Sequence, residues 1–212
     1  MPLKVSEIFH SIQGESSWSG RPCVFVRLTG CNLRCAYCDT RYAYEQGRLM
    51  EIPEILEQVR RLRCDLVEVT GGEPLIQEET PSLVDGLIGG GHTVLLETNG
   101  SIDISGVDRR CARIMDIKCP SSGMAGQNDL RNLKRLRARD ELKFVIGNRR
   151  DYEFAKDILP TLPAARIKIN FSPVFGALAP RSLAEWILDD RLAVRLNIQL
   201  HKIIWGPEAT GV

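Results

Sequence analysis

Three cysteines, Cys31, Cys35 and Cys38, stand close together in the sequence, at spacings of four and three residues. Thiolates this close on one loop can turn inward together and hold a metal centre. A structural zinc site usually takes a fourth Cys or His, and none of the three histidines of the chain has finger-like spacing to the group. A cuboidal 4Fe–4S cluster bound by three thiolates would instead leave one iron open to a small chelating ligand. A zinc knuckle or three incidental cysteines is the simpler alternative.

The remaining cysteines are spread along the chain, at Cys23, Cys64, Cys111 and Cys119. Each is expected to be a small buried or half-buried side chain. Cys119 is the exception that could contribute to a site, because it follows a predicted strand whose end should face the cysteine loop. An odd total of seven cysteines, with early charged residues and no signal-peptide pattern, favours a cytoplasmic protein whose thiols stay reduced.

A second unusual segment, Thr70-Gly71-Gly72-Glu73-Pro74, follows the apolar run at 66–69. Glycines there let the backbone approach a ligand with no side chain in the way. Glu73 and Pro74 are expected to fix the turn. A lone segment of this kind is more often a plain strand-to-helix turn, so its weight comes from its place one strand after the cysteine loop.

Polar or proline-containing loops follow three further apolar segments. They are Glu97-Thr98-Asn99-Gly100, Asp116-Ile117-Lys118-Cys119-Pro120 and Phe171-Ser172-Pro173-Val174-Phe175. Each loop alone could simply cap a turn. The last one is suited to pack against adenine. Because the carboxyl ends of parallel strands meet at one edge of a sheet, the loops together predict a site at that edge.

Short apolar segments alternate with amphipathic ones, which predicts an α/β fold with a mainly parallel sheet. We expect strands at 24–28, 66–70, 93–97, 112–117, 141–146, 166–170 and 194–199, and helices near 52–62, 83–88, 129–139, 152–159 and 183–188. A closed (β/α)₈ barrel typically takes about 250 residues, so 212 residues favour one domain, 1–212, built as a partial, open β/α barrel. A net charge of +1 argues against a nucleic-acid module, and no apolar stretch is long enough for a membrane span.

The cysteine spacing, with aromatic Tyr37 before the last cysteine, resembles the cluster motif of the radical S-adenosylmethionine (SAM) superfamily. The Gly-Gly-Glu-Pro segment one β-unit later matches the superfamily's segment for the SAM amino group. The resemblance implies that Cys31, Cys35 and Cys38 hold a 4Fe–4S cluster whose open iron is chelated by SAM. An electron from the cluster would then cleave SAM to methionine and a 5′-deoxyadenosyl radical.

Motifs near both ends of the chain resemble one family within this superfamily, the 7-carboxy-7-deazaguanine synthases. They are Gln13-Gly14-Glu15, Cys38-Asp39-Thr40, Glu97-Thr98-Asn99-Gly100 and Gln199-Leu200-His201-Lys202. The resemblance runs in order from about Val5 to Pro207. It implies a carbon–nitrogen lyase of queuosine (7-deazapurine) biosynthesis that contracts 6-carboxy-5,6,7,8-tetrahydropterin to 7-carboxy-7-deazaguanine with loss of ammonia. In that scheme SAM is regenerated and Mg²⁺ assists.

The resemblance also implies a role for individual residues. Thr40, whose hydroxyl is a hard oxygen, is the implied ligand of Mg²⁺. The residues implied for SAM are Tyr37, Cys38, Asp39, Gly72, Glu73, Glu97, Asp116, Ile117, Lys118, Ser172, Pro173, Val174 and Phe175. The residues implied for the substrate are Ile12, Gln13, Gly14, Glu15, Arg27, Thr70, Asn99, His201 and Pro207, with the N-terminal segment and the C-terminal tail completing the substrate site. No side chain is implied as a classical acid or base, because the radical arises at the cluster and SAM.

The chemistry of these residues suits a carboxylated pterin. Arg27, near a predicted strand end, can offer a bidentate fork to a carboxylate, although it could equally be half of a surface ion pair. Gln13, Glu15 and Thr70 can recognise the donors and acceptors of the pterin edge. The sequence continues for five residues beyond Pro207, so Pro207 is expected to contribute through its backbone only.

Two other functions remain open from the sequence. An activase that places a glycyl radical on a partner protein would share the cysteine and glycine loops, but would not need Gln13, Arg27 and His201 around a pterin. A metal-stapled binding module would need no radical chemistry. For the synthase, the expected partners are the pterin, an electron donor such as flavodoxin or ferredoxin, and a second copy in a homodimer, with no nucleic acid and no membrane. The basic run at 131–139 is interpreted as a solvated helix face.

Overall fold

The computed structural model describes residues 1–162 and 167–212. The strands within these ranges are β1 Leu3–Ile12, β2 Pro22–Leu28, β3 Arg48–Met50, β4 Leu66–Gly71, β5 Thr93–Thr98, β6 Ala112–Ile117, β7 Glu141–Ile146, β8 Lys168–Pro173 and β9 Arg195–Leu196. The α-helices are α1 Ile52–Arg61, α2 Thr80–Gly89, α3 Arg149–Ile158, α4 Pro180–Asp189 and α5 Leu200–Ile204. Short 3₁₀ turns connect several of them.

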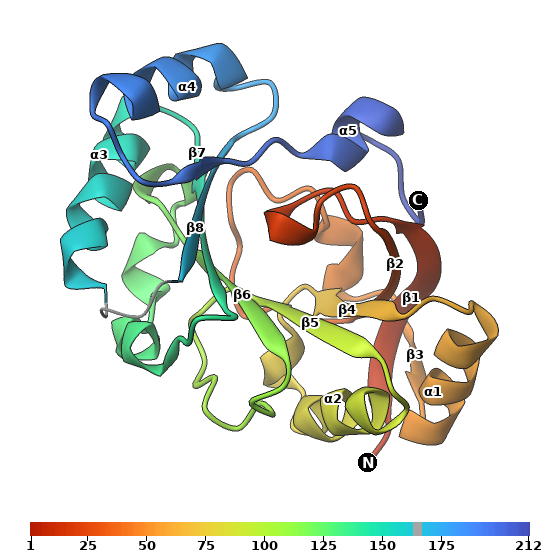
Figure 1. Ribbon diagram of the computed structural model, residues 1–212. Coiled ribbons are helices and arrows are strands. Elements are labelled where there is room, and N and C mark those ends of the chain that lie inside the picture. Colours follow the sequence, from red (N-terminus) through yellow and green to blue (C-terminus); the bar gives the residue numbers. More distant parts are fainter. Residues whose placement is uncertain (163–166) are drawn as a thin grey trace.

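All the strands belong to one sheet, in the order β3-β1-β2-β4-β5-β6-β7-β8-β9 (Figure 1). From β2 to β9 every neighbouring pair is parallel, whereas β1 runs antiparallel to both β2 and β3. Within the described ranges the two edge strands, β3 and β9, do not pair with each other. The sheet is therefore an open, mainly parallel β/α barrel, and the fold class predicted from the sequence is confirmed.

Helices cover the convex side of the sheet (Figure 1). The apolar faces of α1 and α2 bury Ile55, Val59, Leu83 and Leu87 in one core with the first strands. A second core lies under α3 and α4. Proline at the first turn of α1, α2 and α4 suits the helix start, where a backbone N–H would have no partner. No helix in the described part of the chain is both long enough and apolar enough to cross a membrane.

The concave side of the sheet changes character along the strands. Successive side chains of a strand point to opposite faces, so every second residue enters the barrel. Toward the amino ends of the parallel strands, the inner residues form an apolar cluster of Cys23, Phe25, Leu66, Leu95, Ala112 and Ile114. Toward the carboxyl ends they are polar: Arg27, Glu68, Thr70, Glu97, Asp116 and Lys143. A polar cavity thus lies above an apolar floor.

The loop between β1 and β2 runs inside the curve of the sheet (Figure 1). Its 3₁₀ turn, Ser16–Trp18, reaches β7, where the Ser17 backbone N–H donates to the Glu141 carboxylate at 2.9 Å. Trp18 packs against the inner apolar cluster. The loop is closed on itself by Gln13, whose N–H donates to the Arg21 carbonyl at 2.8 Å. The N-terminal segment therefore fills the barrel and forms part of the cavity.

The helix predicted at 129–139 is wrong, because the segment forms a 3₁₀ helix over Leu130–Arg135. The buried amide of Asn132 donates to two carbonyls of the loop between β5 and β6, those of Gly100 and Ile102, at 3.0 and 2.7 Å. Leu133 and Leu136 are both buried, and side chains three residues apart lie above one another in a 3₁₀ helix. These tertiary contacts outweigh the helical pattern of the sequence.

The last predicted strand, 194–199, shrinks to the two residues of β9. Its chain turns away early, because the Asn197 side chain donates to the Ser172 hydroxyl at 2.9 Å and the next residues start α5. His201 and Lys202 accordingly lie on a short helix and not at a strand end. Of the strand predicted at 166–170, Arg166 lies outside the described residues and the strand begins at Lys168. The strands β1 and β3 are additions to the predicted set.

Candidate active site

A cavity of about 730 Å³ opens at the carboxyl edge of the parallel strands. This volume lies in the range typical of ligand and cofactor sites. The three clustered cysteines and Thr40 line it, as does every residue predicted for the substrate: Ile12, Gln13, Gly14, Glu15, Arg27, Thr70, Asn99, His201 and Pro207. Segments from the start, middle and end of the sequence therefore meet in one place.

The cysteine loop is tied down by its backbone. The Ala36 N–H donates to the Ser122 carbonyl at 3.0 Å, and Leu33 is buried beneath the loop. Cys31, Cys35 and Cys38 are half-buried and free of disulfides. Burial raises the pKa of the Cys31 and Cys35 thiols, so binding a metal centre at neutral pH would release their protons.

The three thiols of the loop fit an iron–sulfur cluster in their chemistry and their number. Such clusters are held by cysteine thiolates, and three of them leave one iron of a cuboidal 4Fe–4S cluster open to a chelating ligand. Among the described residues, no three Cys, His, Asp or Glu side chains form a group that could hold a single metal ion.

The glycines after β4 are required by packing against the cysteine loop. A Cβ at Gly72 would lie 2.2 Å from the Gly30 carbonyl oxygen, and one at Gly71 would lie 2.4 Å from the Leu28 carbonyl oxygen. The Glu73 N–H donates to the Gly30 carbonyl at 2.8 Å. The sequence suggested that the glycines clear space for a ligand, whereas the structure shows that they first clear space for the chain that carries Cys31.

Four residues predicted for SAM do not line the cavity among the described residues: Glu73, Ile117, Ser172 and Pro173. The Glu73 carboxylate accepts hydrogen bonds from the Thr98 hydroxyl at 2.9 Å and the Asn99 N–H at 2.6 Å, so it fixes two neighbouring loops. Ile117 is fully buried in the outer core. The contact of these four residues with SAM stays a prediction.

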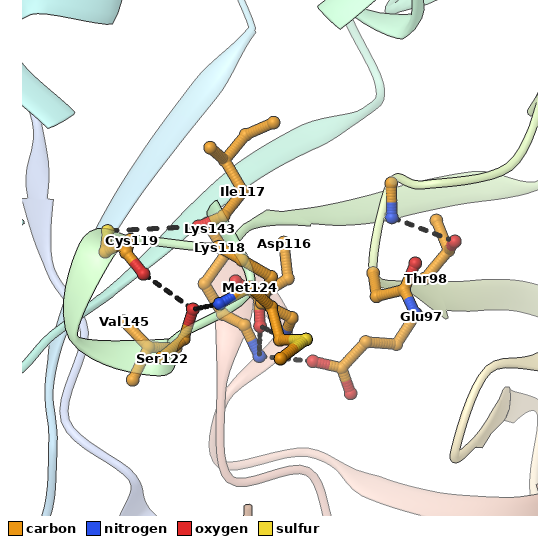
Figure 2. Close-up of polar contacts among 12 residues, drawn as sticks. Glu97, Thr98, Asp116, Ile117, Lys118, Cys119, Ser122, Met124, Lys143 and Val145 are labelled. Carbon is orange, nitrogen blue, oxygen red and sulfur yellow. Dashed lines mark hydrogen bonds and ion pairs between the residues drawn. The ribbon is translucent and has the colours of Figure 1, made fainter. Parts of the chain in front are cut away.

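Charged residues predicted for SAM lie at the ends of β5 and β6 (Figure 2). Asp116 accepts from Lys118 through Oδ2, at 2.8 Å, while its Oδ1 is buried without a hydrogen-bond partner. Burial opposes the charge of Lys118, but Asp116 and Cys35 outweigh it and raise the pKa of its ammonium. The unpaired oxygen of Asp116 offers an acceptor for a bound group. A cofactor that carries hydroxyl, amino and sulfonium groups would bind to such an acceptor.

Lys143 was not predicted from the sequence, yet it lines the polar cavity, where its side chain reaches Glu97 (Figure 2). Its ammonium lies 2.8 Å from Glu15 Oε2, in contact with Glu97 and 3.8 Å from Asp116 Oδ2. Burial opposes this charge, but the carboxylates outweigh it and hold the pKa of Lys143 well above its usual range. Burial also tends to raise the pKa of Glu15, while Lys143, His201 and Gln199 together lower it to about 2. One ammonium therefore joins the predicted substrate side to the predicted SAM side.

Glu68 is a second charged residue of the cavity that was not predicted from the sequence. It is buried in the middle of β4 and accepts a short hydrogen bond from Gln13 Nε2. Burial and the neighbouring Glu97 raise its pKa well above the usual range. The Glu15 N–H donates to Gln13 Oε1 at 2.9 Å. With its oxygen and nitrogen assigned in this way, the Gln13 amide has one fixed orientation toward a ligand.

The C-terminal helix α5 covers the N-terminal loop. Gln199 donates to Glu15 Oε1 at 2.7 Å, and the Leu200 N–H donates to the Gly14 carbonyl at 2.9 Å. A Cβ at Gly14 would lie 2.1 Å from His201 Nδ1, so the imidazole packs directly on that glycine. Lys202 on the same helix lies 2.5 Å from Asp39 beside the cysteine loop. The helix thus connects the substrate loop to the cluster loop.

The other predicted residues take varied positions. Tyr37 donates to the Val145 carbonyl at 3.3 Å, and Thr40 donates to Asp39 Oδ1 at 3.0 Å. Val174 and Phe175 line the cavity at its rim. Cys119 is fully buried, with its thiol toward the Ile117 carbonyl (Figure 2), and burial raises its pKa. It is not among the described residues that line the cavity.

Known proteins match this chain along its whole length. Residues 25–176 match the model of the radical SAM superfamily. The chain is 49% identical to the 7-carboxy-7-deazaguanine synthase of Chlorobaculum tepidum, covering 100% of this chain and 98% of that protein. It is 44% identical to the synthase of the same name from Koribacter versatilis, covering 99% and 100%. The chain belongs to the 7-carboxy-7-deazaguanine synthase family of radical SAM proteins.

A solved structure agrees with this family. The crystal structure of QueE from Escherichia coli superposes with a TM-score of 0.82 at 25% identity, covering 95% of each chain. Family membership implies a 4Fe–4S cluster and SAM as cofactors. Cys31, Cys35 and Cys38 and the unpaired oxygen of Asp116 fit those two groups. The family also implies a small-molecule substrate and a reductant.

Proposed function

We propose that the chain contracts 6-carboxy-5,6,7,8-tetrahydropterin to 7-carboxy-7-deazaguanine with loss of ammonia, as a carbon–nitrogen lyase of queuosine biosynthesis. The observation that carries the proposal is the single cavity shared by the cysteine loop and by Gln13, Glu15, Arg27 and His201. The relatives named as synthases of this product match the chain over its whole length. A cluster loop alone would fit many radical enzymes, whereas these four side chains fit a carboxylated pterin.

When bound, the cluster and SAM supply the radical that removes a hydrogen atom from the substrate. The chain itself positions and encloses the reacting groups. Asp116 and Glu97 offer acceptors to SAM, and Val174 and Phe175 offer apolar surface to its adenine. Tyr37 braces the cysteine loop against β7 through its hydroxyl. Helix α5 lies over the N-terminal loop and limits access of water to the cavity.

On the substrate side, Arg27 supplies the cation for the pterin carboxylate. Arg27 is half of an ion pair, as the alternative from sequence had it, but the pair with Glu7 is half-buried and Arg27 also lines the cavity. The fixed amide of Gln13, the Glu15 carboxylate and the Thr70 hydroxyl present acceptors and donors to the ring edge. His201 closes this set from the C-terminal side.

Further parts of the proposal concern ions and partners. Thr40 lines the cavity next to Asp39, and its hydroxyl oxygen is suited to Mg²⁺, whose other ligands would be waters and the substrate. The reductant is proposed to be a flavodoxin or ferredoxin in the cytoplasm. The active form is proposed to be a homodimer, as is common for such enzymes.

The proposal is tested by anaerobic reconstitution. Protein supplied with iron and sulfide is expected to show the visible absorbance of an iron–sulfur cluster, and with SAM, Mg²⁺ and reductant it is expected to consume the pterin and release ammonia. Arg27→Ala should retain the cluster and lose affinity for the pterin. Full cluster loading without consumption of the pterin would favour the glycyl-radical activase. Stoichiometric zinc without visible absorbance would favour the binding module.

A further inference from the structure

An irregularity in β1 brings a carboxylate beside Arg27. In the antiparallel pair of β1 and β2, Val5 lies opposite Leu28, but the next opposed pair is Glu7 and Arg27. The extra residue, Ser6, makes a β-bulge that shifts the register by one position. Without it, Glu7 would lie opposite Val26, the residue that precedes Arg27 in β2. The bulge therefore places Glu7 and Arg27 side by side at the carboxyl edge of β2.

Two side chains hold the Arg27 guanidinium in place. Glu7 Oε1 accepts from Arg27 Nε at 2.7 Å, and the same oxygen accepts from the Tyr42 hydroxyl at 2.8 Å. The guanidinium carbon also lies 5.8 Å from the Phe9 ring centre and 5.9 Å from the Tyr42 ring centre, so aromatic rings flank it. Burial raises the pKa of Tyr42 to about 12, so its hydroxyl stays a donor at neutral pH.

These contacts leave one edge of the guanidinium available. Within the described residues, Nε of Arg27 is bonded to Glu7, and neither Nη1 nor Nη2 has a hydrogen bond or ion-pair partner. Arg27, Phe9 and Tyr42 line the cavity, but Glu7 does not. The Nη1–Nη2 edge has the spacing that a carboxylate accepts in a bidentate pair.

We propose that Glu7 and Tyr42 are positioning residues, which hold Arg27 by its Nε so that the Nη1–Nη2 edge meets the carboxylate of the substrate. The inference rests on the proposed function and adds to it two residues that set the preference for a carboxylated pterin. Glu7 acts here through the geometry of its hydrogen bonds, because its negative charge by itself opposes the approach of an anion.

The separate effects of geometry and charge make the inference testable. Glu7→Gln supplies an amide oxygen that can accept from both Arg27 Nε and the Tyr42 hydroxyl. The KM of this variant for the pterin is therefore expected within about 3-fold of the wild type. Glu7→Ala frees the guanidinium, and losing a hydrogen bond to a charged group corresponds to about a 10- to 100-fold rise in KM. Tyr42→Phe removes one of the two bonds to Glu7 and is expected to raise KM by about 3- to 10-fold.

The experiment compares these variants as cluster-loaded full-length proteins. Steady-state KM and kcat are measured for the carboxylated pterin, and inhibition constants for tetrahydropterin without the 6-carboxylate. Glu7→Ala should raise KM with kcat within about 3-fold, and it should leave binding of the decarboxylated pterin unchanged. Glu185→Ala serves as the matched control, because it removes a glutamate carboxylate from the exposed ion pair with Arg181 on α4. It should change neither the KM for the carboxylated pterin nor the inhibition constant of the decarboxylated one.

Several outcomes would overturn the inference. An unchanged KM in Glu7→Ala would show that Arg27 needs no support. Equal weakening of both pterins would show a general effect on the fold. A Glu7→Gln variant as impaired as Glu7→Ala would show that the charge of Glu7 matters and that the geometry of its hydrogen bonds is not sufficient. A wild-type protein with an intact cluster that does not turn over the pterin would contradict the proposed function and this inference with it, whereas wild-type turnover with an unchanged KM in Glu7→Ala removes the inference alone.

Discussion

Lys143→Met removes the one ammonium that lies among Glu15, Glu97 and Asp116. Methionine has a similar length and fills the same space without a charge, so the change isolates electrostatics. Lys143 is only 5% exposed, and the carboxylates around it are themselves largely enclosed. Loss of the cation leaves Glu15 buried with only His201 and hydrogen-bond donors to balance it.

The size of the expected destabilisation follows from the burial of Lys143 and its partners. Removing one partner of a buried ion pair typically costs about 3–5 kcal/mol of unfolding free energy. For a domain of this length each kcal/mol lowers the melting temperature by about 2–4 °C, so a decrease of about 6–20 °C is expected at pH 7. Lys156→Met is a matched control on α3, because Lys156 pairs with Asp190 at the surface and an exposed pair contributes at most about 1 kcal/mol.

The deficit should depend on pH with a defined sign. Burial tends to raise the pKa of Glu15, but Lys143 and its other partners lower it from 4.5 to about 2 in the folded protein, so its stabilising contribution is present above pH 4.5 and is lost as the pH falls toward 2. In Lys143→Met the Glu15 carboxyl loses the ammonium that is its main partner, and burial then raises the pKa of Glu15. The variant therefore protonates Glu15 at a higher pH, and its deficit relative to the wild type should narrow as the pH is lowered from 7.

The assay is thermal unfolding of the cluster-free full-length chain, followed by circular dichroism at pH 7 and pH 5. The double variant Lys143→Met, Glu15→Gln should recover part of the stability that Lys143→Met alone loses, because the buried, unpaired charge of Glu15 is removed. A decrease under 2 °C at pH 7, a deficit that widens on acidification, or a double variant no more stable than the single one would refute the reasoning.

Three other substitutions test separate parts of the site. Cys35→Ala should abolish the visible cluster absorbance and turnover together, and cluster retention would remove Cys35 from the ligand set. Thr40→Ala should reduce the dependence of turnover on Mg²⁺, and an unchanged Mg²⁺ titration would exclude Thr40 as a ligand. Gly14→Ala should displace His201, since a Cβ there would lie 2.1 Å from Nδ1, and should raise the KM for the pterin by about 10-fold or more while the cluster stays intact; an unchanged KM would show that His201 is not needed in its present position.

Length, periodicity and spacing predicted the open β/α barrel and its mainly parallel sheet, and they singled out the three cysteines of the cluster loop. They did not predict η6, the 3₁₀ helix over Leu130–Arg135, where a buried Asn132 amide decides the local structure. They also did not predict the short β9, which depends on the side-chain contact of Asn197 with Ser172. Both cases depend on partners distant in sequence, which a local pattern does not contain.

The site residues also divide into those that sequence motifs reveal and those that they do not. Most residues of the recognisable motifs line the cavity, and Glu68 and Lys143 line it as well although they belong to no motif and lie inside strands. A charge in the middle of a buried strand is itself a signal, because it must find partners inside the protein. Glu7 carries no such signal: its position opposite Arg27 depends on the bulge at Ser6, which pairing of the folded strands alone reveals.

The most direct test of the account is product identification after anaerobic turnover with SAM, Mg²⁺, reductant and 6-carboxy-5,6,7,8-tetrahydropterin. Mass spectrometry should find 7-carboxy-7-deazaguanine, accompanied by one ammonia per product and by more than one product per SAM consumed, since SAM is regenerated in the proposed scheme. Absence of this product, from protein whose cluster is intact and which still cleaves SAM, would contradict the account.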